Sequence, residues 1–259
     1  MTKTEQLEEL FKKWQKRQIE EEEKSCKKTI LKNAKVVKQN SFCKDGIICE
    51  EEYSKQKIKV LFIANEPNIE TDEDIEKVEN GATINPVSSQ IKEFKKYYED
   101  DPDHYDDWKG KLRYRLSTII YPAIVNRNLY DFPVADGWKN ANKFAFMNLN
   151  KRGGKAEIRA HLKHYCKYYI EQIIDEISII DPDIIVWLGY GSYNMCFEYA
   201  FKDTATFDND RIFLNIKGKS IPLLKIEHTS AYISDFNRAQ EVRNEMNKHR
   251  ECIEKLINE

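Results

Sequence analysis

The sequence lacks the features of a membrane protein, of a secreted disulfide-bonded protein and of a repeat architecture. No apolar run approaches the roughly 20 residues that a membrane-spanning helix needs. The first residues, Met1 to Gln6, are polar and are followed by acidic residues, which is not the pattern of a signal peptide. Neither internal repeats nor a linker rich in Gly, Ser or Pro occurs. These absences predict a cytoplasmic protein that makes no membrane contact.

Paired cysteines are also missing. The six cysteines are widely scattered, without a Cys-x-x-Cys pair: Cys26, Cys43, Cys49, Cys166, Cys196 and Cys252. In a chain of 259 residues this spacing favours reduced thiols over a disulfide framework. Zinc and iron–sulfur ligands usually come in tight pairs. Cys26, Cys43 and Cys49 could supply part of such a site, but the expectation is no metal and no cofactor.

A strong net charge is absent as well, although the charge is unevenly placed. The formal net charge is −2, which does not by itself indicate a nucleic-acid-binding protein. Between Lys24 and Lys44, however, there are seven lysines and no acidic residue. Such a segment could bind phosphate groups, or it could be a solvated helix face. Charge alone favours the second interpretation.

What is present is typical of a globular protein with an N-terminal addition. Apolar residues make up 41% and aromatic residues 12% of the chain, too much for a disordered protein. Within Glu5 to Lys24, apolar residues such as Leu7, Phe11 and Trp14 recur at helical spacing between charged ones. We therefore expect residues 1–50 to be a helical extension that packs on the core, and residues 51–259 to be one main domain.

Strand and helix patterns alternate along this main domain. Short apolar runs predict strands over 57–64, 144–149, 183–188 and 221–226. Helical patterns lie over 87–98, 109–126, 156–180, 192–201 and 235–257. Strands separated by helices form parallel sheets with right-handed crossovers. The sequence thus predicts an α/β fold, a three-layer sandwich with helices on both faces of a central four-stranded parallel sheet.

Three polar clusters follow these predicted strands. They are Asn65-Glu66-Pro67-Asn68, Asn148 to Arg152, and His228-Thr229-Ser230. In parallel sheets the functional groups gather at the carboxyl ends of the strands. We expect the three clusters to converge in space, although they are far apart in the sequence.

In this order and after these strands, the three clusters resemble the motifs of the uracil-DNA glycosylase superfamily. The first family motif reads Gly-Gln-Asp-Pro-Tyr in one branch, and here the stretch is Ala64-Asn65-Glu66-Pro67-Asn68. The last family motif, His-Pro-Ser, is similar to His228-Thr229-Ser230. The resemblance spans about Lys57 to Asn237 and implies the strand order 2-1-3-4. The cysteine that iron–sulfur branches carry after the second strand is absent, which disfavours a cluster.

The resemblance also implies roles for individual residues. Glu66 and His228 would be catalytic: the carboxylate would face the cation that develops on the sugar and orient water, and the histidine would stabilise the departing base. The base would be recognised by Asn65, Asn68 and Asn148. The DNA contacts, including a wedge that holds the base out of the stack, would come from a third set of residues: Ser88, Ser89, Lys151, Arg152, Ser230, Tyr232 and Ile233.

The expected activity is therefore that of a monofunctional DNA glycosylase, a hydrolase that removes uracil or another damaged or modified pyrimidine from duplex or single-stranded DNA. Asn68 replaces the tyrosine that excludes bases substituted at position five, so one alternative is removal of a hypermodified cytosine from phage DNA in anti-phage defence. A second alternative is an inactive DNA-binding module of the same fold. A different α/β hydrolase or nucleotide-binding protein would need motifs that this sequence lacks. We expect a monomer.

Overall fold

The computed structural model describes residues 1–25, 42–65, 94, 108–126, 133–134, 136–151, 159–190, 201–227 and 234–258. Its strands are β1 (Gly46–Ile47), β2 (Val60–Ala64), β3 (Ala145–Asn148), β4 (Ile184–Tyr190), β5 (Ala205–Asp208), β6 (Arg211–Ile216) and β7 (Lys219–Glu227). Its helices are α1 (Lys3–Ser25), α2 (Glu50–Ser54), α5 (Trp108–Arg115), α6 (Tyr121–Val125), α7 (Arg159–Tyr168), α8 (Ile170–Ile180), α10 (Asp235–Lys248) and α11 (Arg250–Asn258). A π-helical turn (Leu116–Ile120) joins α5 to α6, and a 3-10 turn covers Gly137–Asn140.

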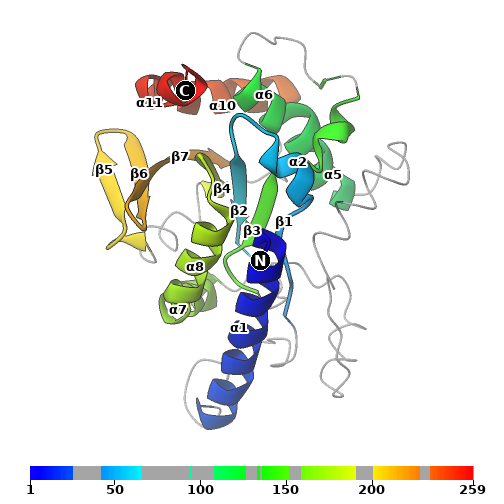
Figure 1. Cartoon of the computed structure of the whole chain (residues 1–259). Helices are drawn as coiled ribbons and strands as arrows, with labels where there is room; N and C mark the ends of the chain where they lie inside the picture. The colour runs from blue at the N-terminus through cyan, green and yellow to red at the C-terminus, as the bar shows by residue number, and fades with distance from the viewer. Residues whose placement is uncertain are drawn as a thin grey trace.

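The strands form one mixed sheet in the order β1-β3-β2-β4-β7-β6-β5 (Figure 1). The four strands that the sequence indicated are β2, β3, β4 and β7, and they pair in parallel in the predicted order β3-β2-β4-β7. The prediction of a four-stranded, wholly parallel sheet was nevertheless wrong. β1 is antiparallel to β3 at one edge, and β6 and β5 continue the sheet as antiparallel strands beyond β7.

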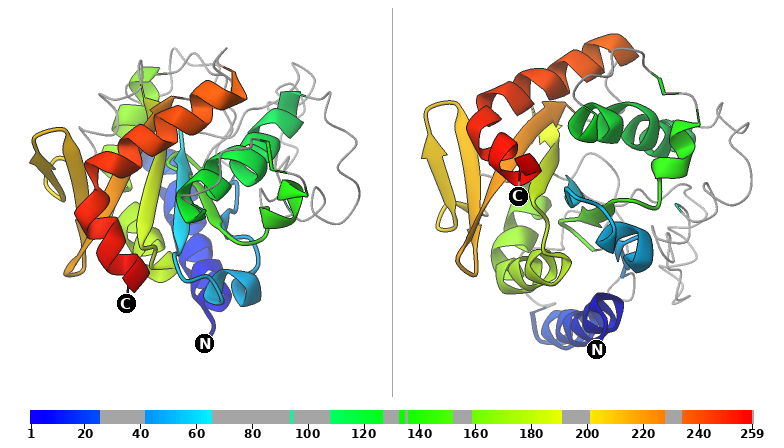
Figure 2. Two further views of the ribbon diagram at one scale, coloured as in Figure 1. Left: turned by 90° about the horizontal axis from the view of Figure 1, so that it is seen from above. Right: turned by 45° about the horizontal axis from the view of Figure 1, so that its top comes forward.

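The sheet separates two layers of helices, as the two views in Figure 2 show. Alternate residues of β2 illustrate the division. Leu61 and Ile63 belong to a core cluster with residues of α1, α7 and α8, whereas Val60 and Phe62 belong to a second cluster with residues of α6, α10 and α11. Because successive side chains of a strand point to opposite faces, a central strand that is apolar throughout must be covered on both sides.

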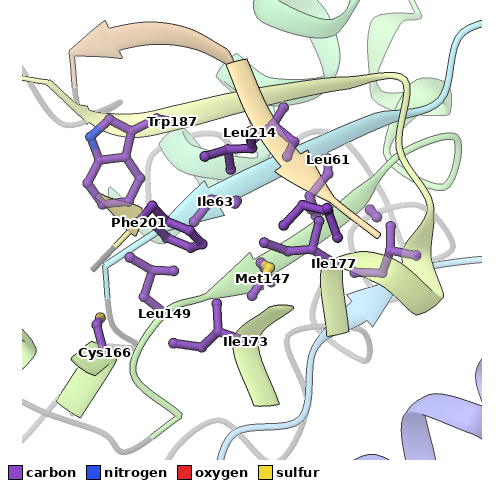
Figure 3. Close-up of a cluster of buried hydrophobic side chains, with 14 of the residues drawn as sticks. Leu61, Ile63, Met147, Leu149, Cys166, Ile173, Ile177, Trp187, Phe201 and Leu214 are labelled. Carbon is purple, nitrogen blue, oxygen red and sulfur yellow. The ribbon is translucent and has the colours of Figure 1, made fainter. Parts of the chain in front are cut away.

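Figure 3 shows part of the first cluster, in which Ile63 of β2 and Met147 of β3 lie near Ile173 and Ile177 of α8. The N-terminal helix α1 completes this layer, with Leu7, Phe11 and Trp14 buried in the same cluster. Leu7 also explains why residue 46 is glycine. A Cβ atom there would lie 2.9 Å from Leu7 Cδ1, and the backbone has a φ of +111°, which L side chains rarely adopt.

Two predicted long helices are interrupted. The helix expected over 156–180 is described from Arg159 and is interrupted at Tyr169, between α7 and α8. The helix expected over 235–257 breaks at His249, between α10 and α11. The helices expected over 87–98 and 192–201 lie outside the described residues, apart from Phe94 and Phe201.

Candidate functional site

The carboxyl ends of the four parallel strands share one edge of the sheet, where the candidate site lies. Ala64 at the end of β2 pairs with Asn148 at the end of β3. The pairing continues past both strands, because Leu149 N donates to Ala64 O at 2.9 Å and Asn150 N donates to Asn65 O at 2.9 Å. Two of the predicted base-reading residues, Asn65 and Asn148, are thereby brought to neighbouring positions at this edge.

Asn65 carries an unpaired acceptor. The residue is buried, with 9% exposure, and its side-chain Oδ1 accepts no hydrogen bond in the part of the chain that the structure describes. A buried polar group without a partner costs roughly 1–3 kcal/mol. This oxygen is therefore a candidate acceptor for a donor on a bound molecule.

Asn148 is buried and is held by Asp45, which lies just before β1. The backbone N of Asn148 donates to Asp45 Oδ2 at 2.6 Å, and its side-chain Nδ2 donates to the same oxygen at 3.3 Å. No described residue donates to Asn148 Oδ1. The amide thus keeps an acceptor for a ligand, while one carboxylate oxygen fixes the other end of the group.

Lys151 lies inside the protein and not on a DNA-facing surface. Its side chain is fully buried, and its Nζ lies 2.5 Å from Asp45 Oδ1. The same Nζ donates to Glu176 Oε1 at 2.9 Å and lies 2.7 Å from Oε2. The rings of Phe11 and Trp14 cover it, with centroids 5.5 Å and 5.4 Å away. The predicted role of Lys151 as a DNA contact does not fit this placement.

Burial and charge together set the ionisation of this cluster. Burial alone would lower the pKa of Lys151, but the charges of Asp45 and Glu176 outweigh it and raise that pKa above its ordinary value. The pKa of Glu176 is raised well above the usual range, mainly by burial and also by the charge of Asp45. The buried cluster therefore holds the Lys151 cation between two carboxyl groups, of which Glu176 resists ionisation.

A second ion pair, between buried Arg238 and half-buried Glu241, holds the end of β7. Glu227 N donates to Glu241 Oε1 at 2.6 Å, and Glu227 O accepts from Arg238 Nη1 at 2.6 Å. Arg238 and Glu241 of α10 also bond each other at 2.7 Å. Burial is the main cause that lowers the pKa of Arg238 and raises that of Glu241. Because the backbone N and O of Glu227 are both hydrogen-bonded, the position of the carboxyl end of β7 is fixed.

The end of β4 is shaped by a bulge. The pairing between β4 and β7 shifts register between Leu188 and Tyr190, and bulges of this kind often lie next to functional sites. The intervening Gly189 is required by packing, since a Cβ atom there would lie 2.6 Å from the Trp187 ring. Packing against Trp187 therefore explains why residue 189 is glycine.

The remaining predicted site residues lie outside the described residues. They are Glu66, Asn68, Ser88, Ser89, Arg152, His228, Ser230, Tyr232 and Ile233. Glu66 directly follows Asn65 in the sequence, and His228 directly follows Glu227. Most of the lysine-rich segment is likewise outside, although its last member, Lys44, forms an ion pair with Glu8 at 2.5 Å.

Sequence reasoning missed Asp45, Glu176, Arg238 and Glu241. One signal for Glu176 was available: it lies on the apolar face of α8, three residues after Ile173 and four before Ile180. A charged residue on such a face requires a buried partner. The sequence does not reveal that the partner is Lys151, because the two residues meet only when α8 packs against the end of β3.

A pocket of about 320 Å³ lies at the opposite edge of the sheet. Gln56 and Ile58, which line it, precede β2, and Lys143 precedes β3. It is therefore at the amino ends of the strands, away from the candidate site. No group of His, Cys, Asp and Glu suited to a metal ion occurs among the described residues.

The comparisons with known proteins leave the geometry as the main guide. No model of a known protein family matches this sequence, and no curated protein gives a significant match. Within the described ranges, no helix is both long and apolar enough to span a membrane.

Proposed function

We propose that this chain is a DNA glycosylase, which hydrolyses the bond between a base and its sugar after the base has left the stack. The observation that carries the proposal is the strand order β3-β2-β4-β7, with all four carboxyl ends at one edge. This order places Asn148, Asn65 and Glu227, each at or next to a predicted motif, along that edge.

The spacing of these strands suits a nucleoside. β4 lies between β2 and β7, and neighbouring strands are about 4.8 Å apart. The ends of β2 and β7 are therefore separated by roughly 10 Å. Glu66, next after β2 and Asn65, would serve the sugar, and His228, next after β7, would serve the base.

The proposed chemistry is electrostatic. Cleavage leaves positive charge on the sugar and negative charge on the base. The Glu66 carboxylate would stabilise the sugar cation and orient the attacking water, while His228 would donate a hydrogen bond to the base. Asn148 and Asn65 would recognise the edge of the base, through the acceptor that each retains.

A cleavage assay tests the proposal directly. Duplexes that carry uracil, a thymine mismatch or a substituted cytosine are incubated with the protein, and abasic sites are scored by alkaline strand cleavage. We expect one of these duplexes to be cleaved. Cleavage of uracil would indicate repair, whereas cleavage of only a substituted cytosine would indicate action on modified DNA. Tight binding without abasic sites would instead indicate an inactive binding module and contradict the proposal.

Variants connect the activity to the two catalytic residues. Glu66→Gln removes the charge and keeps the shape, so cleavage should fall at least tenfold while DNA affinity is kept. His228→Ala removes one preorganised donor, which typically costs about 10²–10³ in rate. Because both groups act on one transition state, the double variant should lose less than the product of the two single losses. Glu251→Gln, an exposed change on α11, is the control and should cleave at the wild-type rate.

A further inference from the structure

Asp45 controls the orientation of the Asn148 amide. Lys151 Nζ donates to Asp45 Oδ1 and the backbone N of Asn148 donates to Asp45 Oδ2, so both oxygens of Asp45 act as acceptors. The group that faces Asp45 Oδ2 must then be Nδ2 of Asn148, and not Oδ1. This interaction settles which way round the carboxamide lies.

The same oxygen also accepts from the backbone N of Asn148. Because the backbone N lies on the Cβ side of the amide, we infer that an oxygen shared with it takes the Nδ2 hydrogen remote from Oδ1. The other Nδ2 hydrogen and Oδ1 remain side by side on the outer edge of the amide. Asn148 thus offers one donor and one acceptor in a fixed order.

That order matters because uracil and cytosine present opposite patterns. Next to one another, uracil has an acceptor at O4 and a donor at N3, whereas cytosine has a donor at N4 and an acceptor at N3. A freely turning amide could pair with either base by rotating through 180°. An amide held in one orientation pairs with only one of them, provided that the base is held in one position.

The surroundings of Asp45 keep this orientation from changing. Asp45, Lys151 and Glu176 are all completely buried, and Phe11 and Trp14 of α1 lie over the ammonium group. Moving Asp45 would leave Lys151 with a partner that resists ionisation, which is costly inside a protein. The cluster therefore acts as a rigid support beneath the amide.

We propose that Asp45 is a positioning residue that decides whether the site accepts a uracil-type or a cytosine-type base, through the orientation it gives to Asn148. This inference rests on the proposed function, in which Asn148 reads the base. It adds to the proposed site Asp45, a residue that belongs to none of the three polar clusters and that pairs with Lys151 beneath α1.

The test compares Asp45→Asn with Glu176→Gln. In Asp45→Asn the new carboxamide oxygen is drawn to Lys151, so an amino group replaces the acceptor that Asn148 N and Nδ2 share, and the Asn148 amide is no longer held in one orientation. Glu176→Gln alters the same buried cluster but leaves both bonds between Asp45 and Asn148. Duplexes with uncleavable 2′-fluoro nucleotides carrying uracil, cytosine or 5-hydroxymethylcytosine are used, and their affinities are measured together with the unfolding midpoint of each variant.

We expect the wild type to prefer one base type at least tenfold, and Asp45→Asn to reduce that ratio at least tenfold. Glu176→Gln should change the unfolding midpoint but keep the ratio within about twofold. A wild type without preference, an unchanged ratio in Asp45→Asn, or equal losses in both variants would overturn the proposal. Cleavage of none of the natural duplexes would count against the proposed function alone, because the affinity ratio does not depend on cleavage.

A second measurement depends on neither DNA nor a folded Asp45 variant. The side-chain amide signals of Asn148 are identified in a ¹⁵N spectrum as those that Asn148→Ser removes. If Asp45 holds the amide, these signals should exchange with solvent much more slowly than those of exposed Asn126 or Asn209. Exchange as fast as that of the surface asparagines would overturn the inference, whether or not the protein acts on DNA.

Discussion

At the scale of single residues, Lys151 shows that a basic residue predicted to contact DNA can instead have a structural role inside the protein. Lys151→Met leaves Asp45 and Glu176 buried without a cation, and breaking a buried pair typically costs about 3–5 kcal/mol. We expect a loss of this size in urea unfolding, and unchanged DNA affinity for the folded protein. Lys12→Met, an exposed change on α1, should leave the stability within about 0.5 kcal/mol. Weaker DNA binding at unchanged stability would restore Lys151 as a surface residue that binds DNA.

His249, at the break between α10 and α11, gives the stability a dependence on pH. Burial lowers its pKa, an effect that Glu245 opposes and that Arg211 and Lys248 reinforce. Since the folded protein binds this proton less readily than the unfolded chain, stability is highest above the ordinary pKa of about 6.5 and falls as the pH is lowered through it.

A variant isolates this contribution. His249→Phe removes the titrating group and keeps an aromatic ring beside Phe213, whose centroid lies 5.1 Å from that of His249. Urea unfolding at pH 7.5 and 5.5 should show a larger loss for the wild type than for His249→Phe, by about 1.4 kcal/mol for each pKa unit of depression. Equal losses in the two proteins would show that His249 does not set the pH dependence.

At the scale of elements, the sequence predicts the strands that are buried on both faces. β2, β3, β4 and the centre of β7 are buried on both faces, so each appears as an apolar run. β5 and β6 are partly exposed and show no such run. Their turns contain Asn209 and the Lys217-Gly218 pair at positive φ, a hairpin signal that the strand–helix pattern obscured. The interruptions at Tyr169 and His249 have no proline or glycine to mark them.

The residues of the candidate site also fall into two groups, those that the sequence predicts and those that it does not. Asn65 and Asn148 could be predicted because each lies where an apolar run ends, and the parallel order then brings them together. Asp45 and Arg238 could not, since their partners are distant in sequence or are backbone groups of another element. Buried charges of this kind support the two ends of the proposed site, at β3 and at β7, and only the tertiary fold reveals them.

At the scale of the whole molecule, the net charge of −2 requires that any DNA-binding surface be local. The segment from Lys24 to Lys44 remains the candidate, and the structure accounts for only one of its lysines, since Lys44 is paired with Glu8. For its other lysines, the sequence allows two interpretations, phosphate binding and simple solvation. Salt dependence separates these two cases, because each lysine that binds a phosphate releases counterions from the DNA.

The last prediction uses two triple variants with equal loss of charge. Changing Lys28, Lys32 and Lys35 to Gln should weaken binding alike across DNA sequences and reduce the slope of log affinity against log salt by up to about 0.9 for each phosphate that is no longer neutralised. The control changes three exposed lysines of α1, namely Lys12, Lys13 and Lys16. Affinities between about 50 and 200 mM salt provide the slopes. If the segment binds phosphates, only the first variant flattens the dependence. If both variants shift the slope equally, the effect is one of net charge, and the DNA surface must lie elsewhere on the sheet edge.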